Sequence, residues 1–185
     1  WEDAGGFDVS SITGATALAA QPATTDELVL SDAGTLKRLD FVHIQNRPVF
    51  VIKQDGVTTI SDSSRTKVDL DAADIDTDSG LDTTNKRWTV PAARGGYYFV
   101  TYGLAWNSAA EFGVNVNLFK NGSAVQSVWH SNGPEAYDTF TGSFIVELAA
   151  TDYLELFARQ DSGSNKNAST SDQGLQTFMA GFRLS

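Results

Sequence analysis

Regularly spaced carboxylates are the first residues in this sequence that could do chemistry. Aspartates alternate over residues 74–78, and Asp82 follows. Alternating carboxylates suit calcium, but the EF-hand pattern fails because its sixth and twelfth positions would be Ser79 and Asn85. The same alternation is typical of a solvated edge strand whose charges prevent further pairing. Two interpretations stay open: an edge strand without a metal, and a calcium site formed by Asp76, Asp78 and Asp82.

Catalytic patterns are weaker. The two histidines, His43 and His130, lie in no recognisable nucleophile motif, whereas a triad needs a nucleophile, a base and an orienting group. Glu147 and Glu155 could form the carboxylate pair of a glycoside hydrolase, but nothing in the sequence indicates a cleft between them. The sequence therefore predicts no enzyme, and no cofactor beyond the open question of calcium.

Aromatic rings next to amides and acids recur in the longer segments that the sequence places between strands. Stacking faces combined with directional hydrogen-bonding groups are what a sugar-binding surface uses. The alternative is that the rings cap the core and the polar loops are only solvated. The candidates for contact with a receptor or glycan are Trp106, Asn107, Trp129, His130, Asn132, Tyr137, Asp161, Asn165 and Lys166.

The elements that must position these residues read as strands. Residues 111–120 alternate, with Phe112, Val114, Val116 and Leu118 on one face. No segment has a sustained helical period. Short strands with turn residues between them favour an all-β sandwich or jelly roll. The strands are expected at 48–53, 57–60, 66–70, 86–90, 95–106, 111–120, 124–130, 139–148, 152–159 and 175–184.

The connections alternate in length. Those at 91–94, 121–123 and 149–151 are short, whereas those at 107–110, 131–138 and 160–173 are longer. Because successive strands run up and down, we expect the short turns at one end, which we call the base, and the long loops at the distal tip. The chain should enter the sandwich at the base. Variable loops on a rigid scaffold are where binding sites usually form.

Residues 1–46 differ in texture from the rest. Residues 10–25 are rich in small and polar residues and predict a linker. Residues 26–41 contain two strand-like runs around the turn Ser31-Asp-Ala-Gly34 and predict a hairpin. Two strands alone are marginally stable in water, so the hairpin should need a partner. We therefore divide the chain into an N-terminal anchor segment, 1–46, and a head, 47–185.

Composition narrows the partners. The chain has 185 residues, a formal net charge of −10 and no cysteine. An acidic chain repels phosphate backbones, so nucleic acid is not expected as a partner. Cysteine-ligated zinc and disulfides are excluded. No apolar run approaches the ~20 residues that a membrane-spanning helix requires.

Six motifs in order resemble the globular head of the C1q/TNF superfamily. They are Phe50 in the opening strand, the block from Asp76 to Pro91, Gly96-Tyr-Tyr-Phe99, Phe119-Lys-Asn-Gly122, the run from Thr151 to Phe157, and Thr177-Phe-Met-Ala-Gly-Phe182. The pattern departs from the family where Leu81 replaces an aromatic residue, Trp88 replaces Phe and Thr151 replaces Gly. The resemblance implies a ten-stranded jelly roll that forms trimers and binds rather than catalyses.

The strand around residues 96–106 supports a trimer independently. It is apolar or aromatic on both faces, whereas a sandwich strand covered on one side should alternate more cleanly. A neighbouring subunit would cover the second face, and a loop of the same chain is the alternative. The trimer-interface candidates are Tyr97, Tyr98, Phe99 and Tyr102.

The segment from Asp26 to Leu39 resembles a short hairpin module of bacteriophage tail-fibre and other virion proteins. No collagen-like Gly-X-Y repeat precedes the head in residues 1–46, which argues against an animal C1q relative. We therefore expect a homotrimeric phage fibre, spike or decoration protein on the virion surface. Residues 1–46 would contact other virion proteins, and the head would meet a host receptor or glycan. The alternative is a secreted C1q-like recognition or adhesion protein outside any virus.

Overall fold

The computed structural model describes residues 22–23, 25–40, 47–107, 111–132, 137–168 and 176–184. The chain divides into two compact units, Trp1–Asn46 and Arg47–Ser185, and each is described by itself. The expected linker at 10–25 falls almost wholly outside the described residues, and His43 lies outside them as well. No helix in the described ranges is long and apolar enough to cross a membrane.

The N-terminal unit contains the predicted hairpin. Strands β1 (Glu27–Asp32) and β2 (Thr35–Asp40) pair antiparallel, with Asp32 opposite Thr35 at the turn. Ala33 and Gly34 both have positive φ, which matches the tight turns that join twisted strands. Every residue of β1 is exposed. The hairpin therefore has a defined local fold, and none of its described residues is buried.

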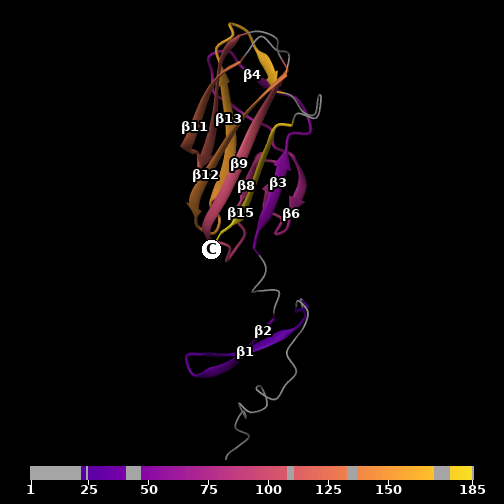
Figure 1. The fold of residues 1–185 in the computed structure, drawn as a ribbon, viewed down its shortest axis with the longest axis vertical. Helices are drawn as coiled ribbons and strands as arrows, with labels where there is room; N and C mark the ends of the chain where they lie inside the picture. Colours follow the sequence, from indigo (N-terminus) through magenta and orange to yellow (C-terminus); the bar gives the residue numbers. More distant parts are fainter. Residues whose placement is uncertain are drawn as a thin grey trace, which may run out of the picture. The chain divides into compact units, whose positions relative to one another are not determined.

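The head is built from two packed sheets, and Figure 1 shows their strands lying along its length. No strand of the described head runs into a helix. In chain order the strands are β3 (Val49–Lys53), β4 (Thr58–Ile60), β5 (Thr66–Lys67), β6 (Ala72–Asp76), β7 (Leu81–Asp82), β8 (Arg87–Thr89), β9 (Gly96–Asn107), β10 (Phe112–Lys120), β11 (Ser123–Asn132), β12 (Tyr137–Leu148), β13 (Tyr153–Gln160), β14 (Lys166–Ala168) and β15 (Phe178–Arg183).

The first sheet has the order β4-β14-β9-β15-β3-β6, and β12 also pairs with β9. The second sheet has the order β11-β10-β13-β8-β7, and β5 also pairs with β13. All pairings between these named strands are antiparallel. Non-consecutive neighbours in both sheets mean that the chain repeatedly crosses from one layer to the other, as in a jelly roll.

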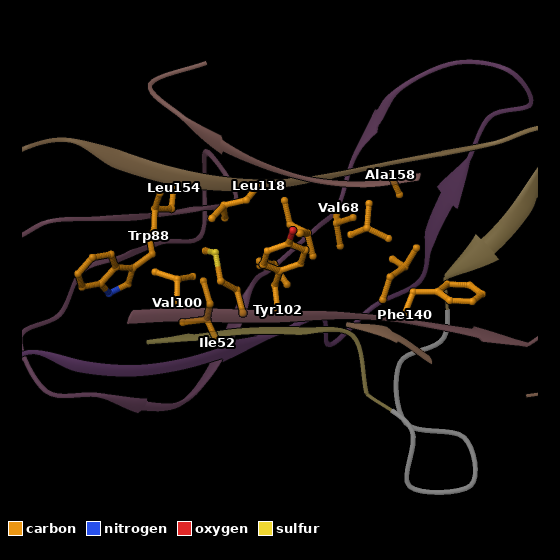
Figure 2. Close-up of a cluster of buried hydrophobic side chains, with 14 of the residues drawn as sticks. Ile52, Val68, Trp88, Val100, Tyr102, Leu118, Phe140, Leu154 and Ala158 are labelled. Atoms are coloured by element: carbon orange, nitrogen blue, oxygen red, sulfur yellow. The ribbon is translucent and has the colours of Figure 1, made fainter. Parts of the chain in front are cut away.

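The core fills the space between the two layers. Figure 2 shows Val100, Tyr102 and Ile52 on the side of the first sheet, with Leu118 and Leu154 opposite them. These side chains are fully buried. Trp88 stacks on Phe50 with ring centroids 4.1 Å apart. Burial raises the pKa of Tyr102 to about 12, and its hydroxyl donates to Gln126 Oε1 at 3.0 Å.

The two ends of the head differ as the turn lengths predict. The short connections after β8, β10 and β12 lie together, because Val90 N donates to Asp152 O and Asn121 N donates to Tyr153 O. Asn121 and Gly122 both have positive φ, which closes the expected Asn-Gly hairpin turn. Arg183 N donates to Pro48 O, so the chain enters and leaves the sandwich at this same base. β4 lies at the opposite, distal end in Figure 1.

One short strand agrees with an interpretation of the sequence, and another was not expected. β6 is a short edge strand paired with β3, in agreement with the edge-strand interpretation of residues 74–78. The long segment 160–173 was expected to be a loop, yet it contains β14, which pairs with β4. Short strands of two or three residues carry no periodic signal, so they are visible only once their partners are in place.

Candidate functional site

Strand β9 divides the first sheet into two faces of different character. Its even-numbered residues from position 98 on point into the core and are fully buried: Tyr98, Val100, Tyr102, Leu104 and Trp106. Tyr97 and Phe99 point the other way, and the side chain of Tyr97 is 50% exposed. Side chains on a strand alternate between faces, so a strand that is apolar throughout must present rings on both sides. The double apolar character of residues 96–106 is therefore a feature of the folded head.

An apolar patch covers the base half of this outward side. The pairing register aligns Ile145 of β12, Phe99 of β9 and Phe182 of β15 in one row across three strands. The rings of Phe99 and Phe182 lie 5.6 Å apart. Ile145 is 57% exposed and Phe182 is 43% exposed. We call this patch the apolar outer face; its members are Val49, Val51, Ile75, Tyr97, Phe99, Ile145, Phe182 and Leu184.

Half of the expected trimer-interface residues lie on this face and half do not. Tyr97 and Phe99 are on it, whereas Tyr98 and Tyr102 are fully buried within the chain, so their assignment to an interface was wrong. The hydroxyl of Tyr98 donates to Arg94 O at 2.5 Å. Burial is also the main cause that raises the pKa of Tyr98. The period-2 alternation assigns alternate residues to opposite faces, and applying it to 96–106 would have excluded both tyrosines.

Ile145 and Phe182 were missed, although the sequence carried a signal for them. Phe144-Ile145 and Phe178-Met-Ala-Gly-Phe182 are apolar at successive positions, so each strand has hydrophobic side chains on both faces. Met179 points into the core while Phe178 and Phe182 point outward. The same argument that singled out residues 96–106 applies to these two shorter runs.

The outer side of the second sheet is different, because cations and rings alternate across it. The guanidinium of Arg65 lies 5.2 Å from the ring centroid of Phe119, and that of Arg159 lies 5.9 Å from the ring centroid of Trp129. Phe119 also packs against Phe157 with centroids 4.4 Å apart. We call this surface the cation–aromatic face: Arg65, Phe119, Trp129, Phe157 and Arg159. The attraction between a cation and the face of an aromatic ring contributes about 0.5–1 kcal/mol at exposed sites.

A buried amide network lies beneath the cation–aromatic face. Asn117 is fully buried, and its Nδ2 donates to Asn115 Oδ1 at 2.6 Å. Ser127 Oγ donates to Asn117 Oδ1 at 2.8 Å, and Asn115 Nδ2 donates to Val128 O at 3.2 Å. Asn115 and Asn117 lie on the face of β10 opposite the core residues Val114, Val116 and Leu118, and the alternation alone does not predict their burial. Satisfied amides of this kind hold β10 and β11 in one register.

The expected distal contacts are only partly at the surface. Trp106 was wrongly chosen as a contact residue; it lies inside β9, within the strand expected at 95–106, and is fully buried, with its ring 5.5 Å from that of Phe112. Trp129 and His130 belong to β11, where Trp129 is 59% exposed and His130 stacks on Phe140 at 4.9 Å. Thus the rings occupy strand ends rather than loop tips.

The remaining distal candidates are polar. Asp161 is exposed and accepts a hydrogen bond from Gly113 N at 2.6 Å, while Asn165 Oδ1 accepts from Asp62 N at 3.3 Å. The ammonium of Lys166 lies 5.7 Å from the ring centroid of Phe112. Asn107, Asn132 and Tyr137 stand at strand ends, and their side chains lie outside the part of the chain described.

The aspartates considered for calcium are each engaged elsewhere. Asp76 accepts from Gly80 N, Leu81 N and Trp88 Nε1, Asp78 accepts from Arg94 Nε, and Asp82 accepts from Asn85. The hydrogen bonds from Asn85 are the main cause that holds the pKa of Asp82 below its usual value. No three His, Cys, Asp or Glu residues converge on a metal-sized position within the described ranges. The three carboxylates organise the turn around β7 rather than one shared site.

The carboxylate pair considered for hydrolysis is separated by the whole sandwich. Glu147 lies opposite Tyr97 on the outer side of the first sheet. Glu155 lies opposite Phe119 on the outer side of the second sheet and forms an ion pair with Lys67. Two carboxyl groups that flank a scissile bond must lie within ~10 Å of each other on one surface. Glu147 and Glu155 cannot share a substrate.

Known structures match the head. No protein-family model matches the chain, and no curated protein is similar to it in sequence. Murine APRIL superposes with a TM-score of 0.55 at 19% identity, over 75% of this chain and 100% of that one. The globular domain of a zebrafish complement C1qA protein has a TM-score of 0.54 at 12% identity, covering 75% and 98%.

The head has the C1q/TNF-like jelly-roll fold. An Eiger TNF from S. frugiperda matches as well, with a TM-score of 0.54, 14% identity, and coverage of 75% of this chain and 92% of that one. The expected fold class is therefore confirmed. The matched share is about the size of the unit that begins at Arg47.

Proposed function

We propose that the chain is a homotrimeric, non-catalytic recognition protein whose C1q/TNF-like head assembles through the apolar outer face. The observation that carries this proposal is the row of Ile145, Phe99 and Phe182, which stays substantially exposed in the single chain. Contiguous apolar patches on one face mark sites of protein association. The cation–aromatic face on the second sheet is more polar, so covering it with another protein would be less favourable.

A copy of the same chain is the partner that best fits this face. The support is the similarity of the head in fold to a complement C1qA globular domain and to a TNF protein. Closed cyclic assembly would bring three apolar outer faces around one axis and leave the second sheets outside. The bases of three heads would then face the same way, with their distal ends displayed together.

We place this recognition protein on the surface of a bacteriophage particle, as a fibre, spike or decoration component. The support is the resemblance of residues 26–39 to virion hairpin modules and the exposed leucines of that hairpin. Leu28 and Leu30 are exposed and share one side of it with the half-buried Leu39, which pairs with Leu28. An uncovered apolar side on a two-stranded sheet requires a partner, and other virion proteins would supply it.

The virion assignment is tested by proteomics of particles purified on a density gradient from the source of the gene. Peptides of this chain should copurify with the particles. Recovery only in a soluble secreted fraction would instead support a C1q-like adhesion protein outside any virus.

The recognition role is tested by competition. The purified 185-residue chain, added in excess to host cells before the particles, should slow adsorption of the particles because it occupies the same surface receptors or glycans. A Lys120→Ala chain, altered at the base, serves as the matched control and should compete equally. Undiminished adsorption at saturating chain would reject a receptor contact by this protein.

A further inference from the structure

The distal part of the cation–aromatic face contains an exposed indole beside an uncommitted guanidinium. Trp129 on β11 is opposite Asn115 on β10, and Asn115 is opposite Arg159 on β13. The three residues therefore form one row across three strands, with the guanidinium of Arg159 5.9 Å from the indole centroid. The indole remains 59% exposed despite this contact.

Arg159 is positioned but not neutralised. Its Nε donates to Ser63 O at 3.1 Å, which fixes the side chain along the sheet. It forms no ion pair with any carboxylate in the described parts of the chain, although most described cations of the head do. The terminal nitrogens of a guanidinium are donors in a planar fork that fits a carboxylate in two-point geometry. The fork of Arg159 is therefore available to a carboxylate, although the chain as a whole has a net charge of −10.

Hydrogen bonds around the row of Trp129, Asn115 and Arg159 hold it in place. The amides of Asn115 and Asn117 beneath it are buried and hydrogen-bonded to each other. Asp161 folds over the backbone of Gly113, and a Cβ at residue 113 would lie 2.9 Å from Asp161 Oδ2. Asp161 Oδ1 is committed to Gly113 N, so Oδ2 is the oxygen left to accept a hydroxyl proton. A preformed surface of this kind loses little entropy when it binds a ligand.

We propose that Trp129 and Arg159 form a binding site for a carboxylate-bearing pyranose, such as a uronic or sialic acid residue of a surface polysaccharide. The indole takes the apolar C–H face of the sugar ring, the guanidinium of Arg159 takes its carboxylate, and Asp161 accepts from a ring hydroxyl. This inference deepens the proposed recognition function by naming the ligand class. The acidity of the whole chain disfavours a polyanion held by charge alone, so the indole contact is necessary.

The experiment titrates the 185-residue chain with free D-glucuronic acid, with N-acetylneuraminic acid and with D-glucose, the neutral counterpart of glucuronic acid. Indole N–H resonances are followed by NMR, since Trp129 is the exposed tryptophan among the described residues. At least one acidic sugar should shift the Trp129 signal with a roughly millimolar dissociation constant, as expected for a single small contact surface. Glucose should bind about tenfold more weakly because it lacks the charge-assisted hydrogen bonds.

Two variants assign the roles. Trp129→Ala should abolish binding of all three sugars, monitored by backbone amides of β10. Arg159→Gln should keep weak binding but remove the preference for the acidic sugars. Arg87→Gln is the matched control, because Arg87 also covers a ring, Tyr153 at 4.3 Å, but lies near the base and pairs with Asp82.

Several outcomes would overturn the site. Neither acidic sugar shifting the Trp129 signal would do so, and so would equal losses in the Arg159 and Arg87 variants. Displacement by sulfate as effective as by glucuronate would reduce the site to a simple anion contact. The site lies within one chain, so its failure leaves the trimer unaffected, and a monomeric chain could still bind the sugar.

Discussion

Each of the two outer sides of the sandwich has a large hydrophobic side chain that is exposed to a similar extent. The residues around these two side chains differ. Ile145 on the apolar outer face is 57% exposed, and Trp129 on the cation–aromatic face is 59% exposed. Across the strands Ile145 is aligned with Phe99 and Phe182, so its row is apolar, whereas Ser143 and Glu147 precede and follow it on β12. Trp129 stands over a guanidinium and a hydrogen-bonded amide network.

The difference shows that the neighbours of an exposed side chain, rather than its exposure, indicate what it binds. Apolar neighbours gain most from removal of water, at about 25 cal/mol for each Å² buried, and favour a protein partner. Polar neighbours that are already satisfied lose hydrogen-bonding geometry if a flat protein surface covers them. They suit a small ligand with its own polar groups.

Introducing a charge on one face at a time should have the largest effect on assembly or on binding. Ile145→Lys places an ammonium within the proposed interface and should cost about 3 kcal/mol or more per contact, because a buried unpaired charge is strongly unfavourable. Sedimentation equilibrium should then report a single-chain mass. Circular dichroism should show an unchanged fold, since residue 145 is exposed in the single chain.

Trp129→Lys is the matched substitution on the other face. It should lose sugar binding and keep the assembled mass, whereas Ile145→Lys should lose mass and keep sugar binding. If both substitutions dissociated the protein, the distinction between the two faces would be wrong.

Removing the amide network should have a smaller effect, confined to the second sheet. Asn117→Ala leaves Asn115 Oδ1 and Ser127 Oγ without their partners and should cost about 1–3 kcal/mol of unfolding free energy. Urea denaturation would measure the loss. Ser127→Ala is the milder control, because it removes a partly exposed hydroxyl at the edge of the network. Equal losses in the two variants would contradict the central place of Asn117 in the network.

The smallest expected effect concerns acid and should not distinguish the two faces. Burial would raise the pKa of Asp152, but hydrogen bonds from the Asn121 amide, the Lys120 ammonium and Ala149 N outweigh it and hold this pKa below 3.8. A lowered folded pKa contributes stability that is present above pH 3.8 and is lost as the pH falls through the folded value.

The contribution should be about 1 kcal/mol or less, since the Asp152–Lys120 pair is near the surface. Denaturation curves of Asp152→Asn, compared with the parent between pH 2 and pH 7, would check it. The two curves should converge at the acid end. A difference that instead grew on acidification would contradict the assignment.

The fold could be predicted because its long strands and tight turns are locally encoded. Val114, Val116 and Leu118 alternate as expected and are fully buried, and Asn121-Gly122 closes the expected turn. The separation of short turns from long loops followed from the up-and-down path of the chain. The positive φ values at Asn121 and Gly122 agree with a residue pair that tolerates them.

The candidate sites could be predicted less well, because they depend on pairing register. Trp106 directly precedes the connection expected at 107–110, but it is held in β9 opposite Asp138 and Ala168. Arg159 and Trp129 are 30 residues apart, and only the register through Asn115 brings them into one row. Long-range register is set by the whole core, so no local pattern reports it.

The mass of the unaltered 185-residue chain in solution tests the central claim most directly. Sedimentation equilibrium at micromolar concentration should give three times the 19.9 kDa of one chain, about 60 kDa. A mass near 20 kDa over the same range of concentration would show that the apolar outer face does not join copies of this protein.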